Sequence, residues 1–271
     1  RPMSTQFMSV NGGELAYEEA GSGPPLLLIH AGIADRRMWD DTQGAFADRY
    51  RVIRPDLRGF GDTSLPDGPF VYAADMAGLL RALDAPRAHV IGVSIGGSVA
   101  MDLALAHPEL VDRLVLVAPG LSGWEWGEEA QVGFAAEEAA VEAGDLDEAS
   151  WVAVRIWLDG PSRTPDQVDS ELRRRVFEMQ RHALEYDNDK AEGGWLVADR
   201  RGRMGEITSP TLMVVGNLDQ PDRVDFARHM ADHILGARLE VMKGVAHLPP
   251  MEAPEAFIGL VVPFLEGGTG S

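Results

Sequence analysis

One serine in this chain lies midway between two glycines, in the pentapeptide Gly92–Gly96 (GVSIG). Residues 89–91 before it are typical of a strand, and residues 97–106 after it are typical of a helix. A G-x-S-x-G sequence in that setting forms a nucleophile elbow, a tight turn that exposes the serine Oγ. Glycine is needed at both ends because a Cβ would collide across the turn. We therefore interpret Ser94 as a nucleophile, in preference to a simple helix N-cap.

A serine hydroxyl reacts at neutral pH only when a base takes its proton and a third group orients that base. His247 follows the apolar segment 239–242 and should lie just after a strand. Asp219 follows the strand-like segment 213–215. Asp222 is the nearest alternative acid, but its place after Pro221 indicates the first turn of a helix. The sequence predicts a triad of Ser94, Asp219 and His247.

Acyl transfer also needs two N–H donors for the oxyanion. One is expected from Ile95, which follows the serine, and the other from the loop after the strand Pro25–His30. That loop begins His30-Ala31-Gly32, and Trp39 follows it.

With these motifs, and with the triad in the order Ser, Asp, His, the chain resembles the lidded α/β-hydrolase superfamily. Within it, the chain is most similar to bacterial esterases, enol-lactonases and cofactor-free haloperoxidases. Aligned from Trp39, the resemblance places His30 on the family histidine, Ala31 on the family glycine and Gly32 on the second oxyanion donor. His30 is then expected to pack the loop. The serine sets the chain apart from the haloalkane dehalogenase and epoxide hydrolase branches, which use an aspartate. Residues 54–64 resemble the family's glycine-rich turn, whose charged residues are expected to hold loops together.

Short apolar runs alternate with helical patterns, which predicts an α/β fold with a mostly parallel, doubly wound sheet. The expected strands are Gly13–Glu19, Pro25–His30, Tyr50–Pro55, His89–Val93, Arg113–Ala118, Thr211–Gly216 and Ala237–Val241. The expected helices are Arg36–Ala47, Phe70–Leu83, Ile95–Ala106, Pro221–Ile234 and Pro254–Leu265.

The alternation breaks between residues 121 and 206, where helical patterns cover 131–142, 146–158 and 164–186. We interpret residues 121–206 as a helical lid inserted after the sixth strand of the family pattern, and residues 1–120 plus 207–271 as the α/β-hydrolase core. Five of the six tryptophans fall in this lid. Trp124 and Trp126, close to the expected mouth of the site, are predicted to bind substrate, whereas Trp151 and Trp157 are interpreted as helix packing.

The net charge of −19 argues against nucleic acid as a partner, because nucleic-acid binding relies on clustered Lys and Arg. No apolar run approaches the ~18 residues of a membrane span, and no signal peptide is apparent. The absence of cysteine suits a reducing cytoplasm and excludes thiolate metal sites. Neither a metal nor another cofactor is expected, and the oligomeric state stays open.

These features favour a serine hydrolase that cleaves a small or medium, neutral or apolar carboxylic ester or lactone through an acyl-enzyme on Ser94. A C–C bond hydrolase acting on a diketone, and a perhydrolase, would use the same triad. A ligand sensor on this scaffold is a further alternative, since fold does not fix function.

Overall fold

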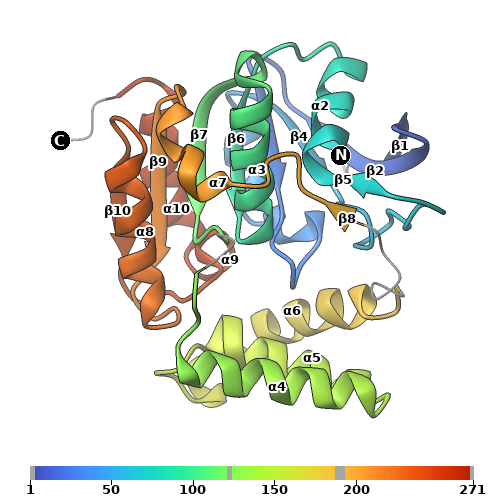
Figure 1. The fold of residues 1–271 in the computed structure, drawn as a ribbon, viewed down its shortest axis with the longest axis vertical. Coiled ribbons are helices and arrows are strands. Elements are labelled where there is room, and N and C mark those ends of the chain that lie inside the picture. Colours follow the sequence, from blue (N-terminus) through green and yellow to red (C-terminus); the bar gives the residue numbers. More distant parts are fainter. Residues whose placement is uncertain (1–3, 121–123, 187–192, 269–271) are drawn as a thin grey trace.

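A single mixed sheet forms the centre of the molecule in the computed structural model, which describes residues 4–120, 124–186 and 193–268 (Figure 1). Its order is β1-β2-β4-β3-β6-β7-β9-β10. The pairs β1–β2 and β2–β4 are antiparallel, and all other neighbours are parallel. The strands are β1 (Gln6–Val10), β2 (Gly13–Ala20), β3 (Pro25–Ile29), β4 (Arg51–Pro55), β6 (Ala88–Val93), β7 (Val111–Val117), β9 (Thr211–Gly216) and β10 (Arg238–Met242). The short β5 (Phe70–Val71) and β8 (Gly193–Gly194) pair separately.

Helices cover both faces of this sheet, as the predicted doubly wound fold requires. Residues alternate between the two faces along each strand. On β3, for example, Leu27 and Ile29 belong to one buried cluster, and Leu26 and Leu28 to the other. The first cluster includes residues of α2 (Tyr72–Ala82), α3 (Ile95–Ala106) and α8 (Asp222–His233), and the second residues of α1 (Gln43–Ala47) and α10 (Pro254–Leu265). The predicted fold class is confirmed.

The predicted elements differ from the observed ones mainly at the edges. The sequence patterns did not reveal β1, which pairs with β2 through a tight turn at Asn11 and Gly12, both at positive φ. The expected helix Arg36–Ala47 is divided into the 3-10 helix η1 (Arg36–Trp39) and α1. Thr42, between them, donates its hydroxyl hydrogen bond to the Trp39 carbonyl, 3.3 Å away, a local bond that competes with helix continuation.

A layer of helices lies between β7 and β9 in the sequence and beyond one end of the sheet in space (Figure 1). It contains α4 (Glu128–Glu142), α5 (Leu146–Val154), the π-helix η3 (Arg155–Asp159), η4 (Pro165–Gln167) and α6 (Ser170–Ala183). The short α7 (Arg200–Arg203) and η6 (Met204–Glu206) lie against the core instead, where Arg200 pairs with Asp102 of α3. Residues 121–123 and 187–192 of the predicted lid lie outside the described residues, and its boundaries stay a prediction.

Two further short helices complete the described part of the core: η2 (Pro108–Leu110) and α9 (Pro249–Glu252). Among the described residues, no helix combines the length and the apolar character needed to cross a membrane.

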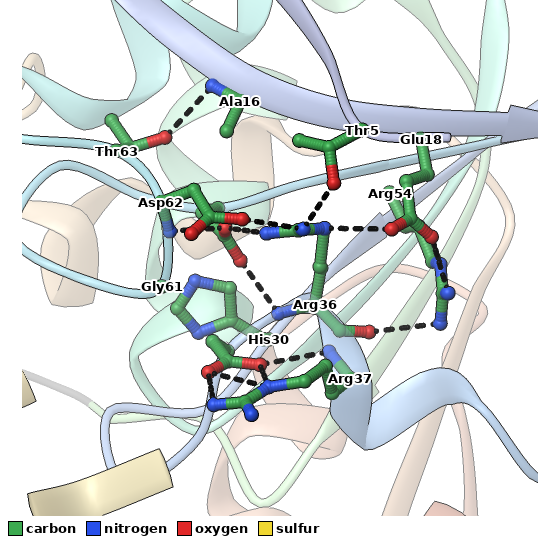
Figure 2. Close-up of polar contacts among 12 residues, drawn as sticks. Thr5, Ala16, Glu18, His30, Arg36, Arg37, Arg54, Gly61, Asp62 and Thr63 are labelled. Atoms are coloured by element: carbon green, nitrogen blue, oxygen red, sulfur yellow. Dashed lines mark hydrogen bonds and ion pairs between the residues drawn. The ribbon is translucent and has the colours of Figure 1, made fainter. Parts of the chain in front are cut away.

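A network of buried charges fixes the loop that follows β3 (Figure 2). Arg36 binds the carboxylates of Glu18, Asp56 and Asp62, and its backbone N–H donates to Asp56 at 2.8 Å. Arg54 binds Glu18 and donates to the Arg36 carbonyl at 3.1 Å. Apart from the exposed Asp62, these charged side chains are buried, and buried charges are tolerated only when they are paired. The predicted loop-holding role of the charged residues in 54–64 is confirmed.

His30 ties the same loop to the turn after β4. Its Nε2 accepts a hydrogen bond from the Leu57 N–H at 2.9 Å, so the ring proton is on Nδ1, which donates to the Ala31 carbonyl at 2.8 Å. Burial lowers the pKa of His30 below its usual range. The predicted packing role of His30 is confirmed, and the neutral ring makes both bonds.

Substitution of Gly92 tests the close backbone contact at the elbow. A Cβ there would lie 2.2 Å from the Gly96 carbonyl oxygen, so Gly92→Ala should destabilise the fold by about 3 kcal/mol or more. Gly259 is the matched control, because it lies in α10 with no atom within 4 Å of the added Cβ. Gly259→Ala should stabilise by about 0.5–1 kcal/mol through helix propensity. Urea unfolding measures both, and similar stability of the two variants would contradict this contact.

His30 should also make stability depend on pH. Because its folded pKa lies below the unfolded value of about 6.5, the unfolded chain binds more protons as the pH falls. Stability is therefore full above pH ~6.5 and is lost below it, by up to about 1.4 kcal/mol per pH unit from this group. Urea unfolding at pH 7, 6 and 5 should show a shallower loss in His30→Gln than in the native chain. Burial also lowers the pKa of His89, but both proteins contain this residue, so it cannot cause a difference between them. If stability falls equally with pH in both proteins, the prediction is wrong.

Candidate active site

Ser94 sits at the turn between β6 and α3 in a backbone conformation that few residues adopt. Its φ is 56° and its ψ −115°, a conformation that costs of order 1–3 kcal/mol and persists only because the surrounding structure imposes it. The Ser94 N–H donates to the Val117 carbonyl at 2.8 Å, and its own carbonyl accepts from Ser98 at 3.1 Å. These bonds and the glycine contacts around the turn hold the hydroxyl at the start of α3, as the elbow motif predicts.

His247 and Asp219 are brought together although 28 residues separate them. His247 Nδ1 lies 2.7 Å from Asp219 Oδ2, and both side chains are buried. Asp219 Oδ1 accepts from the Gln220 N–H at 2.7 Å, which leaves Oδ2 aimed at the imidazole. The loops that carry the two residues touch directly, since a Cβ on Gly216 would lie 2.1 Å from the Ala246 carbonyl oxygen. This is the orienting contact expected between an acid and a base.

Ser94 and His247 line the same cavity, which has a volume of about 220 Å³. Its other walls are Ala31, Gly32, Ile33, Glu137, Trp157 and Gln180. His247 Nε2 is buried and has no hydrogen-bond partner among the described residues. Catalytic hydrogen bonds are often long before substrate binds, so an unpaired Nε2 in this position is compatible with a base facing Ser94.

The two predicted oxyanion donors are neighbours. Gly32 lines the cavity, and a Cβ on it would lie 3.5 Å from Ile95 Cγ2. Ile95 is the first residue of α3, so its N–H belongs to the unpaired N-terminal turn of that helix. The structure therefore places Gly32 next to Ile95, at the cavity that Ser94 lines.

Trp157, which the sequence patterns assigned to helix packing, forms one wall of the cavity. It lies in the π-helix η3, a local irregularity that is common at functional sites. Its carbonyl accepts from the His247 N–H at 3.3 Å, and the two rings pack with centroids 4.4 Å apart. Only the tertiary contact with His247 reveals this position.

Trp124 and Trp126 lie farther out and line a second, open hollow of about 580 Å³. Trp126 packs on Trp157 at 5.6 Å between ring centroids. Trp124 donates its indole N–H to Asp222 at 3.2 Å and packs on Phe226 of α8. Asp222 is the first residue of α8 and so lies in its first turn, as predicted. It contacts Trp124, whereas Asp219 contacts His247.

Glu252 is a contact of the His247 loop that sequence patterns missed. Its carboxylate accepts from the N–H groups of Ala246 and Leu248, on either side of His247, at 2.9–3.0 Å. Arg163 of the helical layer donates to the same carboxylate at 2.8 Å. Burial raises the pKa of Glu252, and the N–H donors and Arg163 oppose that shift. Glu252 is the fourth residue of α9, and with Leu248 at the N-cap the sequence carries no capping motif that could have found this contact.

The comparisons with known proteins agree with this geometry. Residues 24–254 match the family described as the alpha/beta hydrolase fold. An uncharacterised protein of Mycobacterium tuberculosis is 32% identical over 291 residues, which cover 98% of this chain and 82% of that protein. A pimeloyl-[acyl-carrier protein] methyl ester esterase of Neisseria meningitidis is 33% identical over 247 residues, with 89% and 92% of the two chains covered.

Among solved structures, a hydrolase from Pseudomonas aeruginosa PA01 superposes with a TM-score of 0.81 at 30% identity, over 98% of this chain and 99% of that one. The family match spans most of the chain and includes Ser94, Asp219 and His247. With the sheet order, the elbow and the His247–Asp219 contact, these matches show that the chain belongs to the alpha/beta hydrolase family.

Proposed function

We propose that the protein is a serine hydrolase that cleaves a small or medium carboxylic ester or lactone through an acyl-enzyme on Ser94. The observation that carries the proposal is one cavity lined by both Ser94 and His247, with Asp219 2.7 Å from the far nitrogen of that histidine. The esterase relative from Neisseria meningitidis supports ester cleavage.

In this mechanism, His247 Nε2 takes the hydroxyl proton as Ser94 Oγ attacks the carbonyl carbon of the substrate. Asp219 holds the imidazole with its proton on Nδ1 and stabilises the imidazolium that forms. The N–H groups of Gly32 and Ile95 stabilise the tetrahedral oxyanion. The imidazolium then protonates the leaving alcohol. Water, deprotonated by His247, attacks the acyl-enzyme and restores Ser94.

The volume and walls of the cavity support a small substrate. At about 220 Å³ it falls below the ~300 Å³ at which sites for drug-sized ligands begin. Trp157 supplies an apolar wall beside His247, and Trp126 backs it. We place the acyl chain against Trp157, and we propose that Trp124 and Trp126 contact larger substrates in the outer hollow. We propose that the layer of α4–α6 acts as the lid, because Glu137 and Gln180 from this layer line the cavity together with Ser94.

Labelling of the nucleophile tests the proposal directly. An organophosphonate should modify Ser94 stoichiometrically, and Ser94→Ala should abolish both labelling and hydrolysis of nitrophenyl esters. Ser98, one turn further along α3, is the matched control because its hydroxyl donates to the Gly120 carbonyl at 2.8 Å. Ser98→Ala should still be labelled. Mass spectrometry that finds the adduct on another serine, or on none, would remove the nucleophile assignment.

Substitution of the orienting acid tests the rest of the triad. Asp219→Asn should lower kcat by about four orders of magnitude, with little change in KM, because the amide stabilises the wrong imidazole tautomer. Asp222→Asn is the control: it changes the same charge three residues away, and its side-chain oxygen can still accept from Trp124. It should be nearly silent. Steady-state kinetics on one nitrophenyl ester measures both, and the opposite ranking would show that Asp222 orients His247.

A further inference from the structure

Glu137 occupies an unexpected place on α4. The helix turns Ala130, Phe134 and Ala140 toward the interior, and Glu137 lies in the same stripe at helical spacing. Phe134, one turn before it, stacks on Trp157 with ring centroids 5.6 Å apart. Glu137 therefore stands where the pattern calls for an apolar residue, and it lines the cavity that holds Ser94 and His247.

The carboxyl of Glu137 is only partly satisfied by the protein. Gln180 Nε2, on α6, donates to Glu137 Oε1 at 3.2 Å, and among the described residues this is its one hydrogen bond. The second oxygen, Oε2, has no partner among the described residues and is not buried, and Glu137 lines the cavity. Burial raises the pKa of Glu137, and the hydrogen bond from Gln180 opposes that shift.

Gln180 is the second half of this feature. It also lines the cavity, is only 5% exposed, and its Oε1 is buried with no partner among the described residues. A buried polar atom without a partner destabilises the fold, and a Leu or Met would fill the same space without that cost. Local rules of this kind are broken chiefly at functional sites. The pair thus points to a ligand group that supplies the missing hydrogen bonds.

We propose that Glu137 and Gln180 form a polar subsite that selects esters carrying a hydrogen-bond donor, such as a hydroxyl, on the acyl or alcohol group. The inference rests on the proposed esterase function and specifies its substrate class. The scissile carbonyl lies at Ser94, and the donor group of the substrate reaches Glu137 across the cavity. A substrate with a carboxylate in that position is disfavoured by like charge. The cavity is therefore apolar at Trp157 and polar at Glu137 and Gln180.

Matched ester pairs, in which a hydroxyl replaces a methyl group, test the subsite. The pairs are ethyl isovalerate and ethyl β-hydroxybutyrate, propyl butyrate and hydroxyethyl butyrate, and ethyl heptanoate and ethyl ω-hydroxyhexanoate. In the three pairs, the hydroxyl lies at three different positions relative to the ester carbonyl. In at least one pair, the native enzyme should favour the hydroxylated ester in kcat/KM, and Glu137→Met should lower that preference about 3- to 10-fold, the value of one hydrogen bond. An unchanged preference in all three pairs overturns the inference.

Two further variants separate selection from structure. Glu138→Met alters the neighbouring exposed carboxylate and should leave every preference unchanged. Glu137→Gln keeps the shape and an acceptor oxygen for Gln180, so it should retain the melting temperature. It should also raise the relative kcat/KM for monoethyl adipate, which carries a carboxylate, over that for ethyl heptanoate. If Glu137 merely ties α4 to α6, all esters slow together and the melting temperature falls, which also overturns the inference.

Binding measurements keep the test independent of turnover. In two methyl ketones of equal length, one ends in a methyl group and the other in a hydroxyl, and neither can be hydrolysed. NMR titration of the native protein should show tighter binding of the hydroxylated ketone, and Glu137→Met should remove that difference. If no ester is cleaved, the proposed function fails, but a binding preference that depends on Glu137 still supports the subsite. Equal binding of both ketones by the native protein argues against it.

Discussion

Three backbone segments meet around Ser94 at distances that admit no side chain. A Cβ on Gly92 would lie 2.2 Å from the Gly96 carbonyl oxygen, and a Cβ on Gly96 would lie 2.4 Å from the carbonyl oxygen of Ile29 at the end of β3. The elbow is therefore pressed against the strand that leads into the Gly32 loop. Because backbone cannot move aside as a side chain can, this contact fixes the proposed nucleophile relative to the proposed oxyanion donors.

A close backbone contact at a glycine also occurs in the other half of the site, near Asp219 and His247. Gly216 ends β9, and its Cα approaches the Ala246 carbonyl so closely that a Cβ would lie 2.1 Å from the oxygen. That contact aligns the loop of Asp219 with the loop of His247. Glu252 then holds the N–H groups on either side of the histidine. Backbone contacts thus fix how the segments of each half of the site lie against each other. Buried carboxylates then hold the loops by accepting from backbone N–H groups, as Asp56 does in the loop after β3.

Much of this arrangement follows from local patterns in the sequence. The elbow glycines, the strand before Ser94 and the helix after it are neighbours in the chain, so their spacing encodes the geometry. The predicted bounds of Ile95–Ala106 and Pro254–Leu265 agree with α3 and α10, since both helices are strongly apolar and α10 begins at a proline. Strand β1 escaped prediction because it is an edge strand with mostly exposed or half-buried residues and therefore shows no clear alternation.

The walls of the cavity could not be predicted in the same way, because they depend on how the helical layer docks. In the sequence, Trp157 looks like one more apolar residue of a helix. In the structure it lies in the π-helix η3, and its ring packs on His247. In the sequence, Glu137 looks like one of many acidic residues on a charged helix. In the structure, α6 places Gln180 beside it. Neither partner is near in sequence, so no periodicity or motif joins them.

This difference has a physical basis in how the two parts are built. The sheet is held by backbone hydrogen bonds and by glycine contacts that tolerate no Cβ, so the proposed catalytic residues keep one geometry. The helical layer is held by side chains, such as the pair Arg163–Glu252 and the stack of Phe134 on Trp157, which substitutions can alter singly. A change in α4 or α6 can therefore alter the chemistry of the cavity wall without moving Ser94. In the proposed enzyme, reaction type thus depends on the core, and substrate preference depends on the few side chains that the helical layer contributes to the cavity.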